Sequence, residues 1–224
     1  MGSHSWRLDH YLALTTPLSR REAQRAIRRA EIYVEGRVER QAGRQVNATQ
    51  RIEWRHTVLA APTATYLMLH KPAGWICAAH DARHPCVVDL VKSHHGAALH
   101  VAGRLDLDAT GLVLLTDDGR WSHTLTSPRH KAPKRYRVTV VEDLRDAALL
   151  QLMEGVALKG EAHPARAVAV ERISERIITL TLTEGRYHQV KRMVAAIGNR
   201  VTALHREAIG GITLDGDLAA GVYR

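Results

Sequence analysis

The sequence predicts an α+β protein made of a small N-terminal domain and a larger, strand-rich domain. Along residues 66–224, short strand patterns adjoin one another with few helical patterns between them, which favours a mixed, mainly antiparallel sheet flanked by helices. Positive charge gathers in the first 56 residues, which hold eleven arginines, no lysine and six acidic residues. The small, uncharged stretch around Pro62 is typical of a linker. We therefore expect domains over residues 1–58 and 66–224, joined by a linker over 59–65.

Composition narrows the class of function. The chain has 224 residues, 45% apolar and 25% charged, so it is neither disordered nor collagen-like. Its formal net charge of +9 makes a polyanion, first of all a nucleic acid, the leading candidate partner. No apolar stretch approaches the roughly 18 residues that span a bilayer, so we expect a soluble protein without membrane association. Cys77 and Cys86 form no C-x-x-C pair, which indicates neither a disulfide framework nor a zinc knuckle and favours a reducing cytoplasm.

The N-terminal domain is expected to place two helices on a small sheet. Leu8, Tyr11 and Leu12 have the spacing of a short amphipathic helix that ends before Pro17. A second helix follows Ser19-Arg20-Arg21-Glu22, which is a capping-box sequence. Its apolar stripe is Ala23, Ala26, Ile27 and Ala30, which leaves Arg21, Arg25, Arg28 and Arg29 facing solvent or a ligand. Strands are predicted over residues 32–34 and 37–39, joined as a hairpin, and over residues 51–54.

The larger domain is predicted to consist mainly of strands. Alternating or apolar patterns indicate strands over residues 66–70, 134–141, 167–170, 177–182 and 200–205. Residues 188–197 predict a helix, because Val190, Met193, Val194 and Ile197 have core spacing and Gly198 is placed to stop it.

The first candidate functional segment is a polar loop that leads into an apolar strand, over residues 102–119. Its Gly103, Asp106 and Asp108 lie where a loop is held at a strand edge, a usual place for functional carboxylates. The alternative is a solvated turn whose aspartates bond their own backbone, and Asp117-Asp118-Gly119 fits that alternative better.

The second candidate segment, residues 184–193, is a turn that opens the helix predicted at residue 188. Arg186, His188, Lys191 and Arg192 lie near the start of this helix, where cations oppose the helix dipole and call for an anion. A phosphate or a carboxylate such as Asp106 would serve. A plain basic surface patch is the alternative.

Together these segments resemble the pseudouridine synthase superfamily, most closely the branch that isomerises one uridine in 16S rRNA. Residues 7–55 resemble an S4 RNA-binding module through Arg7-Leu8-Asp9, Ser19-Arg20 and Val34-Glu35-Gly36. Residues 66–224 resemble the catalytic domain through five motifs in order: residues 69–74 (LHKPAG), 103–106 (GRLD), 134–136 (KRY), 184–193 (EGRYHQVKRM), and 204–207 (LHRE) with 209–212 (IGGI). Members of this family commonly continue a little beyond the position of Arg224.

The resemblance implies the roles of individual residues. Asp106 is the catalytic aspartate, Tyr136 the aromatic residue that stacks on the target base, and Lys191 the cation paired with the aspartate, where many relatives have Arg. The RNA-binding residues expected in the N-terminal domain are Arg7, Ser19, Arg20, Arg21, Arg25, Arg28, Arg29 and Arg37. Those expected in the catalytic domain are Lys71, Arg104, Arg186, His188 and Arg192. We expect Lys71 to have a structural or RNA-contacting role and no part in the chemical steps.

The implied reaction breaks the bond from C1′ to N1 and joins C1′ to C5, without net redox change or hydrolysis, so we expect no cofactor and no metal. The aspartate can attack C1′, attack C6 of the ring, or assist deprotonation at the ribose. The target base must leave its stack, which requires an aromatic platform. Asp108 is the main rival of Asp106 as the catalytic carboxylate. His94, His95 and His100 lack a carboxylate or cysteine at ligand spacing and are expected to be surface histidines.

Three hypotheses follow. The first is a cytoplasmic, monomeric synthase acting on 16S rRNA, naked or within a partly assembled small subunit. A related synthase acting on large-subunit rRNA is the second, although the resemblance favours the small subunit, because large-subunit relatives typically have a different residue in place of His188. The third is a catalytically silent S4-type rRNA-binding or assembly protein, which would have no need of Asp106, Tyr136 and Lys191 together.

Overall fold

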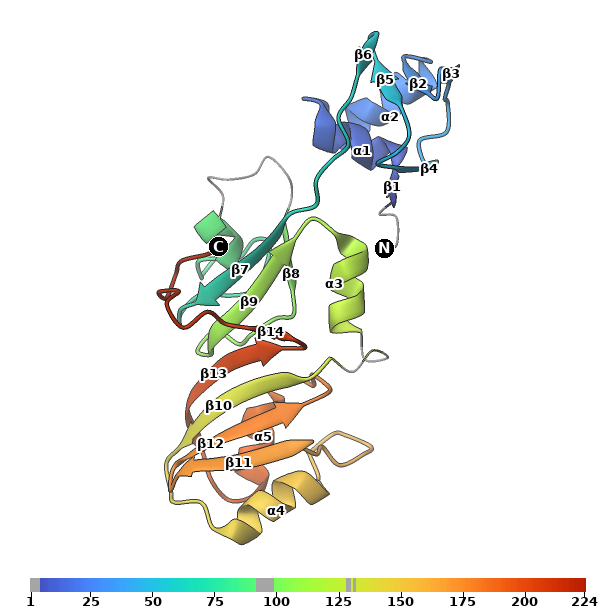
Figure 1. Cartoon of the computed structure of the whole chain (residues 1–224). Coiled ribbons are helices and arrows are strands. Elements are labelled where there is room, and N and C mark those ends of the chain that lie inside the picture. The colour runs from blue at the N-terminus through green and yellow to red at the C-terminus, as the bar shows by residue number, and fades with distance from the viewer. Residues whose placement is uncertain (1–4, 92–98, 128–129, 131) are drawn as a thin grey trace. The chain divides into compact units, whose positions relative to one another are not determined.

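The structure, a computed structural model, describes residues 5–91, 99–127, 130 and 132–224. The chain divides into two compact units, Met1–Ala64 and Thr65–Arg224, hereafter unit 1 and unit 2 (Figure 1). Each unit has a hydrophobic core of its own. In the described ranges, no helix has both the length and the apolar character needed to cross a bilayer.

Unit 1 packs two helices with short strands. Helix α1 (Leu8–Thr15) follows strand β1 (Ser5–Arg7), which pairs antiparallel with β4 (Gln45–Asn47). Helix α2 (Arg20–Arg28) starts at Ser19 with the predicted capping box. The second sheet has the order β3-β2-β5-β6 and consists of β2 (Ile32–Val34), β3 (Arg37–Val38), β5 (Ile52–Trp54) and β6 (Thr57–Val58).

Asp9 is buried among the apolar side chains of unit 1, with no exposed surface. Its carboxylate accepts hydrogen bonds from Arg7 (3.0 and 3.2 Å) and from Gln24 (2.9 Å), and Arg20 lies 3.5 Å away. Burial raises the pKa of Asp9, but these hydrogen bonds and the nearby guanidinium charges outweigh burial and lower the pKa to about 2.

Unit 2 is built on an eight-stranded sheet with the order β11-β12-β10-β13-β9-β7, in which β14 also pairs with β13 and β8 with β9. The strands are β7 (Tyr66–Lys71), β8 (His100–Ala102), β9 (Thr110–Thr116), β10 (Lys134–Val140), β11 (Ala169–Ser174), β12 (Ile177–Leu182), β13 (Val201–Ile209) and β14 (Ile212–Thr213). Strands β9 and β13 run parallel and the other pairs run antiparallel, which confirms the predicted mixed, mainly antiparallel sheet.

Gly111 makes the close approach of the parallel pair possible. A Cβ atom at Gly111 would lie 2.3 Å from the carbonyl oxygen of Arg206 on β13, and Gly111 has a φ of 104°. Any larger residue would push β9 away from β13 and would be strained at that φ. The loop that precedes Gly111 carries Asp106, so this contact fixes where the loop ends.

Helices cover both faces of the sheet. Two helices contribute to the main core. Helix α5 (Gln189–Ala196) crosses behind β10 and β12 in Figure 1, and helix α4 (Asp146–Glu154) contacts the edge strand β11. Helix α3 (Gly119–Thr126) packs on β8, and its Trp121 and Leu125 join the smaller core on the opposite face. A 3-10 helix, η1 (Val87–Val91), lies between β7 and β8 in sequence.

Several boundaries differ from the sequence predictions. The strand expected over residues 167–170 begins at Ala169 and runs to Ser174, and the strand expected to end at residue 205 continues to Ile209. The interpretation of Asp117-Asp118-Gly119 as a solvated turn is wrong for Asp118. This residue is buried, caps the N-terminus of α3 through Arg120 and Trp121, and accepts a hydrogen bond from the hydroxyl of Tyr66.

Candidate active site

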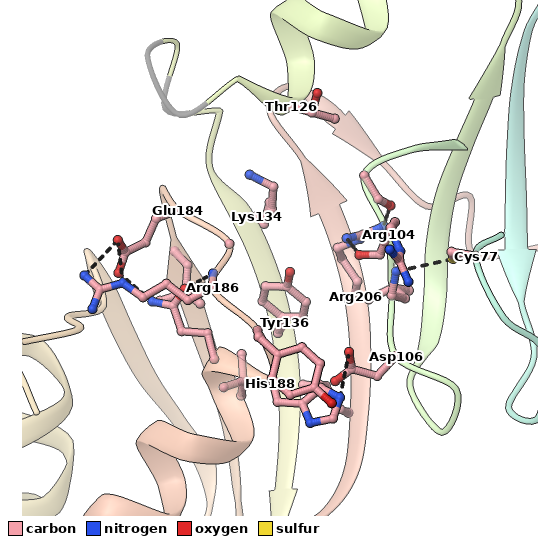
Figure 2. A pocket seen from close by; sticks show the side chains of 18 of the residues that line it. Cys77, Arg104, Asp106, Thr126, Lys134, Tyr136, Glu184, Arg186, His188 and Arg206 are labelled. Atoms are coloured by element: carbon pink, nitrogen blue, oxygen red, sulfur yellow. Dashed lines mark hydrogen bonds and ion pairs between the residues drawn. The ribbon is translucent and has the colours of Figure 1, made fainter. Parts of the chain in front are cut away.

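A cleft of about 670 Å³ in unit 2 brings the two candidate segments together. One wall is the loop of residues 103–107, between β8 and β9, which carries Asp106. The other wall is the turn of residues 182–190, which leads into α5 and carries His188. Lys134 and Tyr136 line the cleft from β10 (Figure 2). The cleft therefore joins segments that lie far apart in the sequence.

Asp106 faces two cationic or potentially cationic side chains. Its Oδ1 atom lies 3.6 Å from Nε2 of His188, and its Oδ2 atom lies 3.6 Å from Nζ of Lys191. In Figure 2 the Asp106 and His188 side chains point toward each other. Asp106 is 28% exposed, so water and a substrate can reach the carboxylate.

Asp108 binds Lys191 more closely than Asp106 does. Nζ of Lys191 donates to both Asp108 oxygens, at 2.5 and 2.8 Å. The hydrogen bond from Lys191 lowers the pKa of Asp108 against the opposing effect of burial. Lys191 thus bridges the two carboxylates, with Asp108 as its direct hydrogen-bond partner and Asp106 at ion-pair distance.

A buried arginine fixes one end of the loop that carries Asp106. Arg206, on β13, is 1% exposed and donates to three backbone carbonyls: Gly103 (2.7 Å), Arg104 (3.1 Å) and Leu112 (2.9 Å). These three acceptors lie on the loop and on the strand that follows it. Because a buried carbonyl without a partner is costly, Arg206 stabilises one conformation of the loop.

A buried lysine fixes the other end of the same loop. Lys71 has no exposed surface, and its Nζ donates to the carbonyls of Pro72 (3.1 Å), Leu107 (3.1 Å) and Ala109 (2.6 Å). Burial lowers the pKa of Lys71, and electrostatic interactions with Cys77, Asp108 and Asp106 oppose that effect. Between the two cations, the amide of Leu105 donates to the sulfur of Cys77 at 3.3 Å. The loop is held at both ends and in the middle.

The turn before α5 places His188. This residue has a φ of 47° and a ψ of 36°, a left-handed conformation that a non-glycine residue adopts at a cost of about 1–2 kcal/mol. The buried Gln189 holds the turn, because its side chain accepts from the amide of Arg186 (2.9 Å) and donates to Glu184 (2.6 Å). Backbone strain at the edge of a cleft, opposed by a dedicated hydrogen-bond network, is typical of a functional site.

Comparison with known proteins agrees with this geometry. A family model described as RNA pseudouridylate synthase matches residues 65–196. The chain belongs to the RNA pseudouridylate synthase family. A relative from Escherichia coli (strain K12), named ribosomal small subunit pseudouridine synthase A, is 45% identical over 219 residues, 97% of this chain and 95% of the relative. A relative of the same name from Pasteurella multocida (strain Pm70) is 43% identical over 97% of this chain and 94% of its own length.

A solved structure titled "Crystal structure of pseudouridylate synthase" is also similar to the synthase described here. It aligns with a TM-score of 0.69 and 40% identity, and the alignment covers 97% of this chain and 94% of that chain. The family resemblance, the fold class and the assignment to the isomerases are thereby confirmed.

Three residues predicted to bind RNA in the synthase domain make contacts within the protein. Lys71 is completely buried, so its RNA-contacting role is wrong and its structural role remains. Arg186 is bound to Glu184 and to the carbonyls of His163 and Pro164. The guanidinium of Arg192 is bound to Glu161 and to the carbonyls of Lys159 and Tyr187. These two arginines tie the turn before α5 to the segment after α4, which leaves them few free donors for a phosphate.

The remaining predicted RNA-binding residues differ in exposure and in whether their side chains already have partners within the protein. Among the described contacts, the side chain of Arg104 is exposed and has no acidic partner, so it is available to a phosphate. The arginines of α2 and its end, together with Arg37 on β3, are exposed on unit 1. Arg7 and Arg20 are shared with Asp9, and the hydroxyl of Ser19 is occupied by Glu22 in the capping box.

Sequence reasoning assigned no role to Arg206, Cys77 or Gln189. Arg206 was detectable in principle, because Leu204 and Ala208 flank it at alternate positions of a strand and share its buried face. The described residues contain no cluster of histidine, cysteine and acidic side chains that could hold a metal ion. His94 and His95 lie outside the described residues.

Proposed function

We propose that the synthase converts a specific uridine of small-subunit (16S) rRNA to pseudouridine, with Asp106 as the catalytic carboxylate. The observation that carries the proposal is the convergence of His188 and Lys191 on Asp106 in a cleft that Tyr136 lines. A carboxylate placed between two such groups and open to substrate suits attack on the sugar or on the base. The names of the two relatives support the small subunit as the source of the substrate.

The proposed step balances without a co-reactant. The bond from C1′ to N1 breaks, the bond from C1′ to C5 forms, and the hydrogen on C5 is replaced by one on N1. Tyr136 holds the uracil by stacking while it turns, which suits an aromatic ring that is buried in the wall of the cleft and still lines it. Arg104, two residues before Asp106, binds an adjacent phosphate or fills the gap left by the flipped base.

We further propose that unit 1 is an S4-like RNA-binding domain that anchors the enzyme. Its support is the exposed row of Arg21, Arg25, Arg28 and Arg29, which lies opposite the buried Ala23, Ala26 and Ile27 of α2. The substrate places the enzyme in the cytoplasm. We expect it to act as a monomer, on naked rRNA or within a partly assembled subunit.

The test is base-resolution mapping of pseudouridine in the rRNA of a strain that lacks this protein. We expect one uridine of 16S rRNA to stay unmodified in that strain and to be modified again when the wild-type chain is supplied. Loss of a pseudouridine from large-subunit rRNA instead would favour the related synthase. An unchanged map would favour the catalytically silent rRNA-binding protein.

A further inference from the structure

Tyr187 is an exposed aromatic side chain at the mouth of the cleft with no part in the contacts described so far. It is 78% exposed, the highest value among the large apolar and aromatic side chains of the described ranges. By contrast Tyr66, another exposed tyrosine, uses its hydroxyl to bind Asp118 and packs edge-on against Trp121. Aromatic Trp, Tyr and Phe residues make up only 4% of the chain, so such exposure is unusual here.

The ring of Tyr187 is nevertheless held in place. It stacks on the imidazole of His188, with ring centroids 3.8 Å apart and planes inclined by 19°. Its backbone carbonyl accepts a hydrogen bond from Arg192, and the neighbouring Arg186 and Gln189 anchor the turn from both sides. One face of the phenol ring is therefore covered by His188, whereas the other face is left open on a rigid turn.

Left-handed backbone at His188 supports this arrangement. The strained residue both directs Nε2 toward Asp106 and stacks on Tyr187, so the phenol ring and the carboxylate are connected through a single imidazole. Tyr187 lines the same cleft as Tyr136, which lies in its wall on β10. The cleft thus carries two tyrosines, one nearly buried at 8% exposed and one open to solvent.

We propose that the open face of Tyr187 is the binding site for the nucleobase next to the target uridine in the RNA chain. Unstacked bases bind to exposed aromatic rings because every base has a π face, and such stacking is tolerant of sequence. Arg104 and Lys134 add positive charge to the cleft, and the described contacts give neither side chain an acidic partner. An extended polyanion with free bases fits these surroundings, whereas an apolar peptide does not. The inference rests on the proposed function, because it assigns a neighbour to the uridine held at Tyr136.

Two variants separate the ring from its hydroxyl. Tyr187→Phe keeps the stack on His188 and the open face, and Tyr187→Leu keeps an apolar side chain but removes the aromatic face. The probe is an RNA oligonucleotide that carries the uridine identified by mapping, with 2-aminopurine placed on its 5′ side in one version and on its 3′ side in the other. We expect the fluorescence of one version to be quenched at saturating wild-type or Tyr187→Phe protein, and not at saturating Tyr187→Leu protein. Quenching that persists in Tyr187→Leu would overturn the proposal.

Single-turnover kinetics test the same site by a second route. We expect Tyr187→Leu to raise the half-saturating protein concentration about tenfold while the saturated rate changes less than about threefold. An abasic residue in place of the stacked neighbour should raise the half-saturating protein concentration by a similar factor. The protein and RNA changes together should raise this concentration little more than either change alone. A lowered saturated rate with unchanged affinity would overturn the proposal, because the ring would then act through His188. If the wild-type enzyme leaves the uridine of this oligonucleotide unmodified, the proposed function fails on this RNA, whereas the fluorescence measurement still reports on stacking because it detects binding and not turnover.

Discussion

In unit 1 the most deeply buried charged side chain is an acid, Asp9, whereas in unit 2 it is a pair of cations, Lys71 and Arg206. The acid is neutralised by guanidinium groups whose side chains stay about half exposed, at 47% for Arg7 and 54% for Arg20. The cations are hydrogen-bonded to backbone carbonyls of one loop and of the segments that adjoin it.

The two units therefore use positively charged side chains in two different ways. Unit 1 keeps its arginines at the surface, where they can contact phosphates, and buries the acid that orients two of them. Unit 2 buries two cations beneath the loop that carries Asp106 and Asp108, where they fix backbone geometry and cannot touch RNA. We therefore expect changes at Asp106 and at the cation beside it to affect turnover, and changes in the exposed arginines of unit 1 to affect binding.

The largest effect should come from the carboxylate itself. Asp106→Asn preserves size and removes the charge, so we expect the single-turnover rate to fall at least about a thousandfold while RNA affinity stays within several-fold. The matched control is Asp108→Asn, which removes the closer partner of Lys191 and should retain most of the rate. An active Asp106→Asn enzyme together with an inactive Asp108→Asn enzyme would show that Asp108, and not Asp106, is the catalytic carboxylate.

Lys191→Met should be the next most severe change. It removes the cation that bridges the two carboxylates, and we expect the saturated rate to fall about a hundredfold, because a paired charge at a reacting group is worth a few kcal/mol. Lys191→Arg should recover part of the rate, since the sign of the charge is kept while its geometry differs. Full activity of Lys191→Met between about pH 6 and 9 would refute the ion pair.

Removing a buried cation should destabilise unit 2. Lys71→Met leaves the carbonyls of Pro72, Leu107 and Ala109 without their donor, so we expect the free energy of unfolding to fall by about 3 kcal/mol in urea titrations. Lys134→Met is the control, because this half-buried lysine has a single described hydrogen bond, to Ala132, and its loss should cost about 1 kcal/mol or less. Equal losses in both variants would show that the loop does not depend on Lys71.

The loop also shows what the sequence could and could not predict. Asp106, Tyr136 and Lys191 could be proposed from the sequence because they stand in motifs that resemble those of the family, and only that resemblance ranks Asp106 above Asp108. Arg206 and Leu112 lie 94 positions apart, and no local pattern reports which carbonyls an inward-facing arginine will meet. Helix α4 was missed although Leu149 and Leu152 have helical spacing, because strand patterns surround it. The resemblance implied a pairing of Lys191 with Asp106 alone, and only the folded structure shows that Asp108 binds Lys191 more closely.

Acid should destabilise unit 1 through Asp9. The pKa of Asp9 is about 2 in the folded protein, against an ordinary value of 3.8 for an exposed aspartate. Its ionised form therefore adds about 2 kcal/mol to the free energy of unfolding. This contribution is fully present above about pH 4 and is lost as the pH falls toward about 2. We expect Asp9→Asn to lower stability by about this amount at neutral pH and to lose less stability than the wild type does as the pH falls through that range. Parallel stability curves for the two proteins over that range would show that ionised Asp9 does not stabilise unit 1.

The smallest change in turnover, with a clear change in binding, should come from the arginines of α2. Replacing Arg21, Arg25, Arg28 and Arg29 with Ser leaves the buried stripe of the helix intact, so unit 1 should stay folded. Each lost phosphate contact lowers the slope of log affinity against log salt by about 0.7 to 0.9, which gives a decrease of about 3 if all four arginines touch RNA.

Phosphate contacts give affinity and register but carry no chemistry, so the saturated single-turnover rate should fall much less than the affinity. Arg145→Ser with Arg166→Ser is the control, because these exposed arginines of unit 2 lie outside the cleft and should leave the slope unchanged. If the four-arginine variant keeps both its affinity and its salt slope, the charge on α2 is only solvated surface. The arginines of α2 would then have no function in RNA binding, and unit 2 would have to find its RNA unaided.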